Sequence, residues 1–188
     1  MASLHKEADR DTLWDRVPSD TVSADYTTQF TKLQKLTRAF AVEGTSLYQN
    51  KELCQDIIDA IDFMINDRQY NGSYSTGNWW DWDIGCPHQL ADILIIISDY
   101  TDDEILKTAA NSIKGYIEFP ERTGANLTDT AIGVLGSVII LKEDYRIEKV
   151  KEMVLTTVGY VTSGDGIYKN GSVIQHTLML ITEVMEMN

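Results

Sequence analysis

The chain has 188 residues, of which 43% are hydrophobic, which suits one globular domain with its own core and argues against disorder. Its 16 lysines and arginines against 29 aspartates and glutamates give a formal net charge of −13, which argues against general binding to nucleic acid or to an anionic membrane, because both need a basic face. The longest apolar run, 93–97, is too short to span a membrane, and residues 1–10 lack the apolar core of a secretion signal.

Apolar residues at three- and four-residue spacing predict six helices along the chain. Their approximate ranges are 24–42, 50–67, 87–100, 103–118, 127–141 and 147–161. Asn50 is placed to cap the second helix, and Pro87 suits the first turn of the third. The run 93–97 has high β-propensity, so a buried strand is the alternative there, but its position among helix-length segments favours a buried helix.

The connections between these helices alternate between short ones and longer ones rich in glycine and aromatic residues. The rich connections are 69–82, 119–126 and 162–172. In an array of antiparallel helices every second connection lies at the same end, so we expect these three loops to share one rim, a favourable place for a ligand site. Trp79, Asn126 and His176 recur 47 and then 50 residues apart, which is about one helical hairpin per step.

Three of the four tryptophans lie between positions 79 and 82. The neighbours Trp79 and Trp80 cannot easily face the same way, and an exposed indole can stack on the apolar face of a sugar ring. The alternative is that all three tryptophans fill the core beneath the loop. Taken singly, Asn126 is typical of a turn or a helix N-cap, and His176 of a structural or surface residue.

Four motifs, read together in chain order, lead to a more specific interpretation. They are GTSLYQN at 44–50, NWWDWDIGCP at 78–87, TGAN at 123–126 and SGDGIYKNGSVIQHT at 163–177. This set resembles the signature of the polysaccharide lyases that include the hyaluronate, chondroitin AC and xanthan lyases, with the hyaluronate branch most similar, over about 13–177. The resemblance implies an all-α fold, an incomplete α/α toroid of antiparallel helical hairpins. Residues 1–188 would then form a single helical domain with an atypical tail at 178–188.

In this family a uronate-containing glycan is cut by β-elimination, in which a base removes the proton beside the carboxylate and hydrogen-bond donors stabilise the enolate that forms. The resemblance assigns the donor role to Asn126, whose side-chain amide can donate to an oxyanion. It assigns His176 as the catalytic histidine, acting as the base or assisting a neighbouring tyrosine. It assigns substrate positioning to Asn78, Trp79, Trp80 and Phe119. The chemistry implies no metal and no other cofactor.

The implied partner is an acidic polysaccharide such as hyaluronan or chondroitin, met outside the cell. The chain departs from the family pattern after the histidine, because the position expected to hold a catalytic tyrosine is about Met185, and His88 stands where relatives often have arginine. We therefore expect weak or absent lyase activity, since losing a general acid or base typically costs about two to four orders of magnitude in rate. The net charge also opposes a polyanion, although Arg122 and Lys169 give the rich loops some local positive potential.

Three other functions follow from the same residues. A non-catalytic glycan-binding module would bind the glycan through the Trp79 and Trp80 surface and would not cleave it. An inverting glycoside hydrolase using Asp81 and Asp83 is disfavoured, because alternate residues near a helix start point apart. A helical scaffold for protein partners would show a bare apolar face away from the loops. The two cysteines, Cys54 and Cys86, allow one disulfide at most, and no cysteine or histidine spacing is typical of a zinc site.

Overall fold

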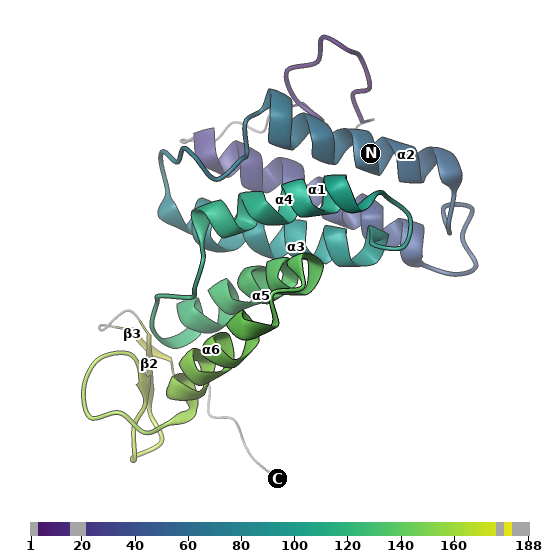
Figure 1. Ribbon diagram of the computed structural model, residues 1–188. Coiled ribbons are helices and arrows are strands. Elements are labelled where there is room, and N and C mark those ends of the chain that lie inside the picture. Colours follow the sequence, from purple (N-terminus) through teal and green to yellow (C-terminus); the bar gives the residue numbers. More distant parts are fainter. Residues whose placement is uncertain (1–3, 16–21, 176–178, 182–188) are drawn as a thin grey trace.

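The computed structural model describes residues 4–15, 22–175 and 179–181, which form a helical array with a small sheet at one end (Figure 1). The α-helices in these ranges are α1 (Val22–Ala41), α2 (Lys51–Asp62), α3 (Cys86–Ile97), α4 (Asp103–Tyr116), α5 (Gly124–Leu141) and α6 (Asp144–Leu155). π-helical turns η1 (Phe63–Asp67) and η2 (Asp81–Gly85) follow α2 and precede α3, and a 3-10 turn η3 (Thr156–Val158) follows α6. The strands are β1 (Gly166–Ile167), β2 (Val173–Gln175) and β3 (Met179–Ile181).

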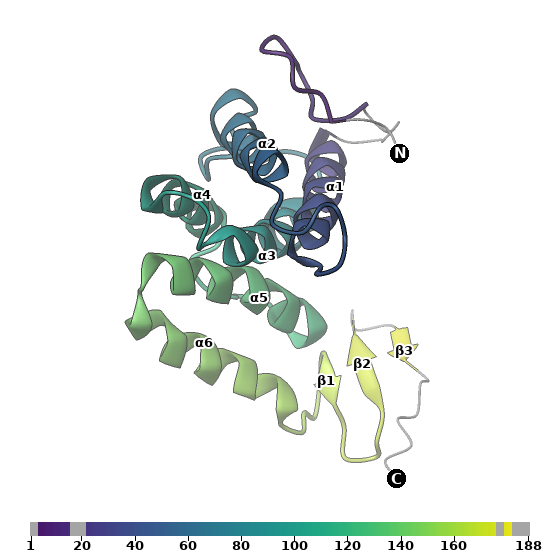
Figure 2. The ribbon, with the colours of Figure 1, turned by 90° about the vertical axis from the view of Figure 1, so that its right-hand side faces the viewer.

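The helices form two groups, α1 to α4 and α5 with α6, and the second group packs against the first through α5. Figure 2 shows α1 to α4 around a common interior, α5 against α3 and α4, and α6 on the far side of α5. The turn between α5 and α6 is two residues long, with Lys142 in the left-handed conformation (φ 57°), so these two helices form an antiparallel hairpin.

Local sequence signals explain where the helices begin. The Asn50 side chain accepts a hydrogen bond from the Leu53 N–H (2.9 Å), which confirms the predicted cap of α2. Pro87 lies in the first turn of α3, where a missing N–H costs nothing. The run 93–97 is helical and confirms the helix over the strand. The predicted end of the last helix was wrong, because α6 stops at Leu155 and the chain then turns through η3.

Most of the core lies between α1, α2, α3 and α4, and a second apolar cluster lies between α5 and α6. The contact of α3 with α5 depends on a backbone approach that a side chain would block. A Cβ added at Gly136 would lie 2.3 Å from the Cβ of Ala91, which is far inside van der Waals contact. Small residues on α5 therefore set the distance at which the second group of helices joins the first.

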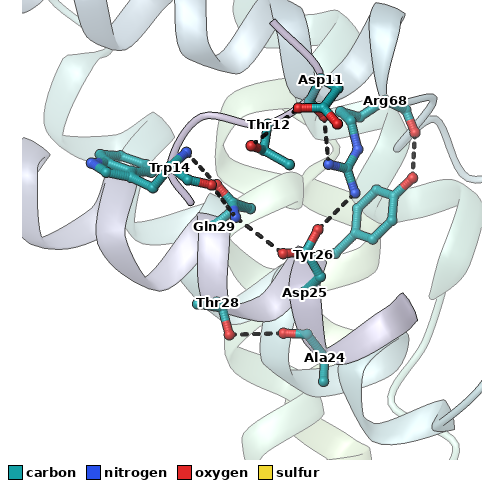
Figure 3. A network of polar contacts seen from close by, with 9 residues as sticks. All are labelled: Asp11, Thr12, Trp14, Ala24, Asp25, Tyr26, Thr28, Gln29 and Arg68. Atoms are coloured by element: carbon teal, nitrogen blue, oxygen red, sulfur yellow. Dashed lines mark hydrogen bonds and ion pairs between the residues drawn. The ribbon is translucent and has the colours of Figure 1, made fainter. Parts of the chain in front are cut away.

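A buried polar network fastens the segment 11–14 to α1 (Figure 3). Gln29 accepts a hydrogen bond from the Trp14 N–H (2.9 Å) and donates to the Trp14 carbonyl (3.2 Å). Arg68 pairs with Asp25 (2.9 Å) and donates to the Asp11 carbonyl (2.9 Å). The segment adds no helix of its own, and these bonds hold it across α1 and the turn that follows η1.

The small sheet was not predicted from the sequence. β1 pairs with β2 and β2 with β3, both antiparallel, so the third glycine-rich loop is a hairpin and not an irregular connection. Strands of two or three residues carry too little alternation to be recognised as a periodic pattern. The fold is still dominated by helices, as predicted.

The structure also shows the state of the two cysteines and the surroundings of the most apolar long helix, α5. Cys54 and Cys86 are both buried and free, so the disulfide that two cysteines would permit does not form. By length and composition, α5 is the one helix in the described ranges that could cross a membrane, although glycine and polar residues interrupt its apolar stretches. The same composition is typical of a core helix, and α5 contacts α3, α4 and α6.

Candidate functional site

The three glycine-rich loops are linked to one another by side-chain contacts. Arg122 of the second loop forms an ion pair with Asp83 of η2, directly after the first loop. Thr123 donates a hydrogen bond to Asp165 of the third loop (3.0 Å), and the Ala125 N–H donates to Gln175 of β2 (2.9 Å). The expectation that these loops share one rim is therefore confirmed for the part of the chain that the structure describes.

The first loop presents two indoles and buries a third. Trp79 and Trp80 are 41% and 39% exposed, whereas Trp82 is 4% exposed and donates its indole N–H to the Thr76 carbonyl (2.6 Å). The Trp82 ring stacks on Tyr70 at 6.0 Å between centroids, inside the main core. The alternative that all three tryptophans fill the core was thus wrong for two of them and right for the third.

Asn78 shapes the turn that carries these indoles. Its side-chain oxygen accepts a hydrogen bond from the Trp80 N–H (3.1 Å), and its own backbone N–H donates to the Ser23 hydroxyl (3.0 Å). The first bond caps the short helical segment that begins at Trp79, and the second fixes the loop to the start of α1. The Asn78 side chain thus shapes the turn through its bond to the Trp80 N–H, and its contact with a substrate stays a prediction.

Phe119 lies half-buried at the edge of an open pocket of about 390 Å³. The pocket is lined by Asp83, Tyr116, Ile117, Glu118, Phe119, Glu121, Arg122 and Thr130. The ring of Phe119 packs against the second apolar cluster, and the buried guanidinium of Arg146 lies 5.6 Å from its centroid. Phe119 is therefore held from behind by α6 while its edge borders the pocket.

Tyr116 is the one tyrosine among the described residues that line this pocket. Burial raises the pKa of Tyr116 to about 12, and its hydroxyl donates to the Tyr74 carbonyl (2.9 Å). The phenol therefore stays neutral at ordinary pH and is not available as a base. Its ring packs against the buried Trp82 (5.3 Å between ring centroids) at the edge of the main core.

Asn126 lies in the first turn of α5 and is half-buried. Its carbonyl accepts a hydrogen bond from the Thr130 hydroxyl (2.6 Å), while no described residue bonds to its side-chain amide. Two residues before it, Gly124 has a φ of +54°, and a Cβ there would lie 2.3 Å from the Gln175 Oε1. Glycine is thus required for β2 to approach the start of α5.

His176 lies outside the described residues, so its assigned role stays a prediction. Its neighbour Gln175 is only 9% exposed and packs against the start of α5 through the bond to Ala125. The Gln175 side chain was not predicted from the sequence to have a role. Its partner lies 50 residues away, and no local pattern indicates that pairing.

Asp81 and Asp83, both in η2, point to different partners. Asp81 is 5% exposed and accepts a hydrogen bond from Thr27 on α1 (2.7 Å), whereas Asp83 pairs with Arg122 at the pocket. This agrees with the expectation that they diverge. Asp81 and Asp83 therefore do not form the pair of carboxylates facing one substrate that an inverting hydrolase uses.

Arg122 connects the indole surface to the second loop. Its guanidinium carbon lies 4.1 Å from the centroid of the Trp79 ring, within the range of a cation–π contact. From the sequence, this arginine was expected only to be a source of positive potential. Its position over the indole depends on the tertiary structure, since 43 residues separate the two.

Residues 1–183 match the family model described as polysaccharide lyase family 8, N terminal alpha-helical domain. The chain is 44% identical over 184 residues to the polysaccharide lyase 8 family protein HylA of Enterococcus faecalis, which covers 93% of this chain and 13% of that protein. It is 38% identical over 195 residues to the hyaluronate lyase HylB of the same species, which covers 93% of this chain and 19% of that protein. The chain thus spans less than a fifth of these curated relatives.

Solved structures of lyases share this arrangement of helices. A Paenibacillus xanthan lyase superposes with a TM-score of 0.85 at 31% identity, over 93% of this chain and 17% of that one. A Streptomyces coelicolor chondroitin AC lyase, solved with chondroitin sulphate, gives a TM-score of 0.81 at 28% identity, over 88% of this chain and 23% of that one. The likeness confirms the predicted all-α fold, an incomplete α/α toroid of helical hairpins.

Proposed function

Because the chain belongs to polysaccharide lyase family 8, we propose that its rim of glycine-rich loops binds a uronate-containing glycosaminoglycan, such as hyaluronan or chondroitin, for cleavage by β-elimination. The observation that carries this proposal is the contact of the exposed Trp79 with Arg122, in the loop that leads to Asn126. Arg122 joins the first loop to the second, and Gln175 joins the third loop to the start of α5. One glycan segment can therefore contact all three loops.

Each loop would supply a different part of the reaction. Trp79 and Trp80 hold the sugar rings by stacking, with Asn78 and Phe119 beside them. The Asn126 amide, which no described residue occupies, donates to the uronate carboxylate as negative charge builds up on it. His176 takes the proton next to that carboxylate, and an acid protonates the departing glycosidic oxygen. No metal or cofactor is needed for this sequence of proton transfers.

The rate of this chain would be low. The position expected to hold the catalytic tyrosine is about Met185, whose side chain can neither donate nor accept a proton. Loss of one proton-transfer group lowers a rate by about two to four orders of magnitude, so a slow residual cleavage is expected. The substrate is a large polyanion that does not cross a membrane unaided, so we expect the reaction to take place outside the cell.

Hyaluronan is the first substrate to test, because a relative at 38% identity is named a hyaluronate lyase. The chain is incubated with hyaluronan or chondroitin, and ultraviolet absorbance from the unsaturated uronate is followed. Elimination produces this absorbance, whereas hydrolysis yields only new reducing ends. Cleavage that gives reducing ends without the absorbance would contradict the proposal.

The test needs a matched pair of asparagine variants. Asn126→Ala should lower the elimination rate by about tenfold or more, since it removes the donor to the developing charge. Asn111→Ala is the control, because Asn111 is an exposed residue of α4 and lies outside the rim loops. Equal rates for the two variants would remove Asn126 from the mechanism.

A non-catalytic glycan-binding module is the second candidate. The exposure of Trp79 and Trp80 favours it, because stacking surfaces need no catalytic tyrosine. A chain of this kind would retard hyaluronan in an electrophoretic mobility assay without releasing unsaturated product, and Trp79→Ala would abolish the retardation. A chain that neither retards nor cleaves the glycan would contradict both functions.

A further inference from the structure

Arg122, which lines the pocket, contacts two partners at once. Its guanidinium stacks 4.1 Å from the centroid of Trp79 and pairs with the carboxylate of Asp83. The Arg122 side chain is 38% exposed and that of Asp83 is 19% exposed, so solvent and a ligand can reach the pair. Among the described residues that line the pocket, Arg122 is the sole cation, while Asp83, Glu118 and Glu121 are acidic.

This arrangement changes what the indole surface offers to a sugar. One face of Trp79 is covered by a planar cation, so a sugar that approaches from that side meets the guanidinium before the ring. A guanidinium binds a carboxylate through two parallel hydrogen bonds, and it can do so while it stays stacked on an aromatic ring. The stacked arginine is therefore a preorganised binding site for a carboxylate.

When no ligand is bound, the Asp83 carboxylate pairs with the Arg122 guanidinium. Solvent reaches one side of this partly exposed ion pair, and pairs of that kind contribute only modest net stability, so a second carboxylate can replace Asp83 at a small cost in free energy. A neutral sugar has no charge with which to compete. The pair therefore favours acidic ligands over neutral ones of the same size.

We propose that Arg122 is the specificity-determining residue for an acidic sugar at Trp79, and that Asp83 is its built-in competitor. The carboxylate of an incoming uronate takes the place of Asp83 on the guanidinium, while the stacking of Arg122 on Trp79 is kept. This inference rests on the proposed function, since it assigns the uronate-recognising group within the same rim. The chain has a net charge of −13, which repels a polyanion. The attraction of a ligand carboxylate to Arg122 opposes this repulsion at the indole surface.

The experiment is calorimetric titration of the full chain with two ligands of equal length, a hyaluronan hexasaccharide and an uncharged oligomer of N-acetylglucosamine, over a time in which the absorbance assay detects no cleavage. Arg122→Gln should weaken hyaluronan binding by about tenfold or more, which is the loss of a charge-assisted bidentate contact. Asp83→Asn should tighten it by about twofold to fivefold, because the modest free-energy cost of displacing the competing carboxylate is gone. Neither variant should change binding of the neutral oligomer by more than about twofold.

Two further variants separate this role from charge and folding effects. Lys169→Gln removes one positive charge from the exposed third loop, and it should weaken hyaluronan binding far less than Arg122→Gln does. Arg122→Lys keeps the charge and loses the planar fork, so it should lie between the wild type and Arg122→Gln. Thermal unfolding of each variant verifies that the fold is intact.

The outcomes distinguish this inference from the proposed function. If Arg122→Gln and Asp83→Asn both weaken hyaluronan binding, the pair is only a structural tie and the inference is overturned while the proposed function stands. The inference is also overturned, again without the proposed function, if Lys169→Gln has as large an effect as Arg122→Gln. A wild-type chain that binds neither ligand and cleaves no glycan overturns the proposed function and the inference together.

Discussion

The side-chain oxygen of Gln175 accepts a hydrogen bond from the backbone N–H of Ala125, 50 residues earlier, at 2.9 Å. This bond fixes β2 to the first turn of α5, next to Asn126. The Gln175 side chain is buried, and its Nε2 has no hydrogen-bond partner among the described residues. The contact places the end of the glycine-rich hairpin and the asparagine of the second loop in one fixed arrangement.

Gly124 is the residue that permits this approach, so Gly124→Ala should destabilise the chain. The new Cβ would lie 2.3 Å from the Gln175 Oε1. The alanine would also have to adopt a left-handed backbone conformation, with φ at +54°. We expect a loss of about 2 kcal/mol or more in the free energy of unfolding, from backbone strain and overpacking together. The measurement is urea unfolding followed by circular dichroism.

Gly44→Ala is the matched control for this prediction. Gly44 also has a positive φ, +80°, but no atom lies within 4 Å of an added Cβ. It should show the backbone cost alone, about 1 kcal/mol. If both variants lose the same stability, the contact with Gln175 does not restrict the position.

Arg68→Met should destabilise the chain strongly, because it removes a cation that pairs with the buried carboxylate of Asp25. The two side chains are 11% and 8% exposed, and Arg68 also donates to the Asp11 carbonyl in the network of Figure 3. Breaking a buried pair by removing one partner costs about 3 to 5 kcal/mol. The midpoint of urea unfolding should fall accordingly.

The exposed pair of Lys107 and Asp103 on α4 provides the comparison. Its side chains are 51% and 72% exposed, and Lys107→Met should change the unfolding free energy by about 0.5 kcal/mol or less. A small effect of Arg68→Met, similar to that of Lys107→Met, would show that solvent reaches Asp25.

Glu143 should make the stability of the chain depend on pH in the acid range. Burial raises the pKa of Glu143, but hydrogen bonds from Lys114 (2.6 Å) and Arg146 (2.7 Å) outweigh this, so the pKa lies below its ordinary value of 4.5. The unfolded chain then binds the proton first as pH falls, so the contribution is complete above pH 4.5 and is lost as pH falls through the lower, folded-state pKa.

Chemical unfolding of the wild type and Glu143→Gln between pH 7 and about pH 3 tests this. The stability difference between the two should be constant above pH 4.5 and should shrink below it. A difference that stays constant across the whole range would contradict the lowered pKa of Glu143.

Neither cysteine should react readily in the native chain. Cys86 has no exposed surface, and burial raises its pKa well above the ordinary value, although its hydrogen bond with Thr27 opposes this shift. Burial also raises the pKa of Cys54, which is 9% exposed. Since the thiolate is the reactive form, iodoacetamide at neutral pH should label both slowly, with Cys54 ahead of Cys86.

Mass spectrometry of labelled peptides measures the order of reaction. In denaturant both cysteines should be labelled at similar rates, which is the internal control. Rapid labelling of Cys86 under native conditions would mean that the helices around it open far more often than their packing indicates.

The sequence predicted the helices well because their signals are local. Apolar periodicity, the Asn50 cap and Pro87 each act within one or two turns, and the structure has helices in all of those places. The end of α6 and the three short strands were missed, since a turn of η3 and strands of two or three residues have no periodic pattern to read. The rim of loops was predicted because alternation of connections follows from an antiparallel array.

The sequence by itself determined the helical array, its ordered family motifs and the side of the array on which the glycine-rich loops lie, because these depend on spacing along the chain. Only the tertiary structure decided that Arg122 stacks on Trp79 and pairs with Asp83, and that Gln175 reaches the start of α5. Such contacts join residues tens of positions apart. They depend on how closely the elements approach one another, which glycines set by the space they leave: Gly136 between α5 and α3, and Gly124 between α5 and β2.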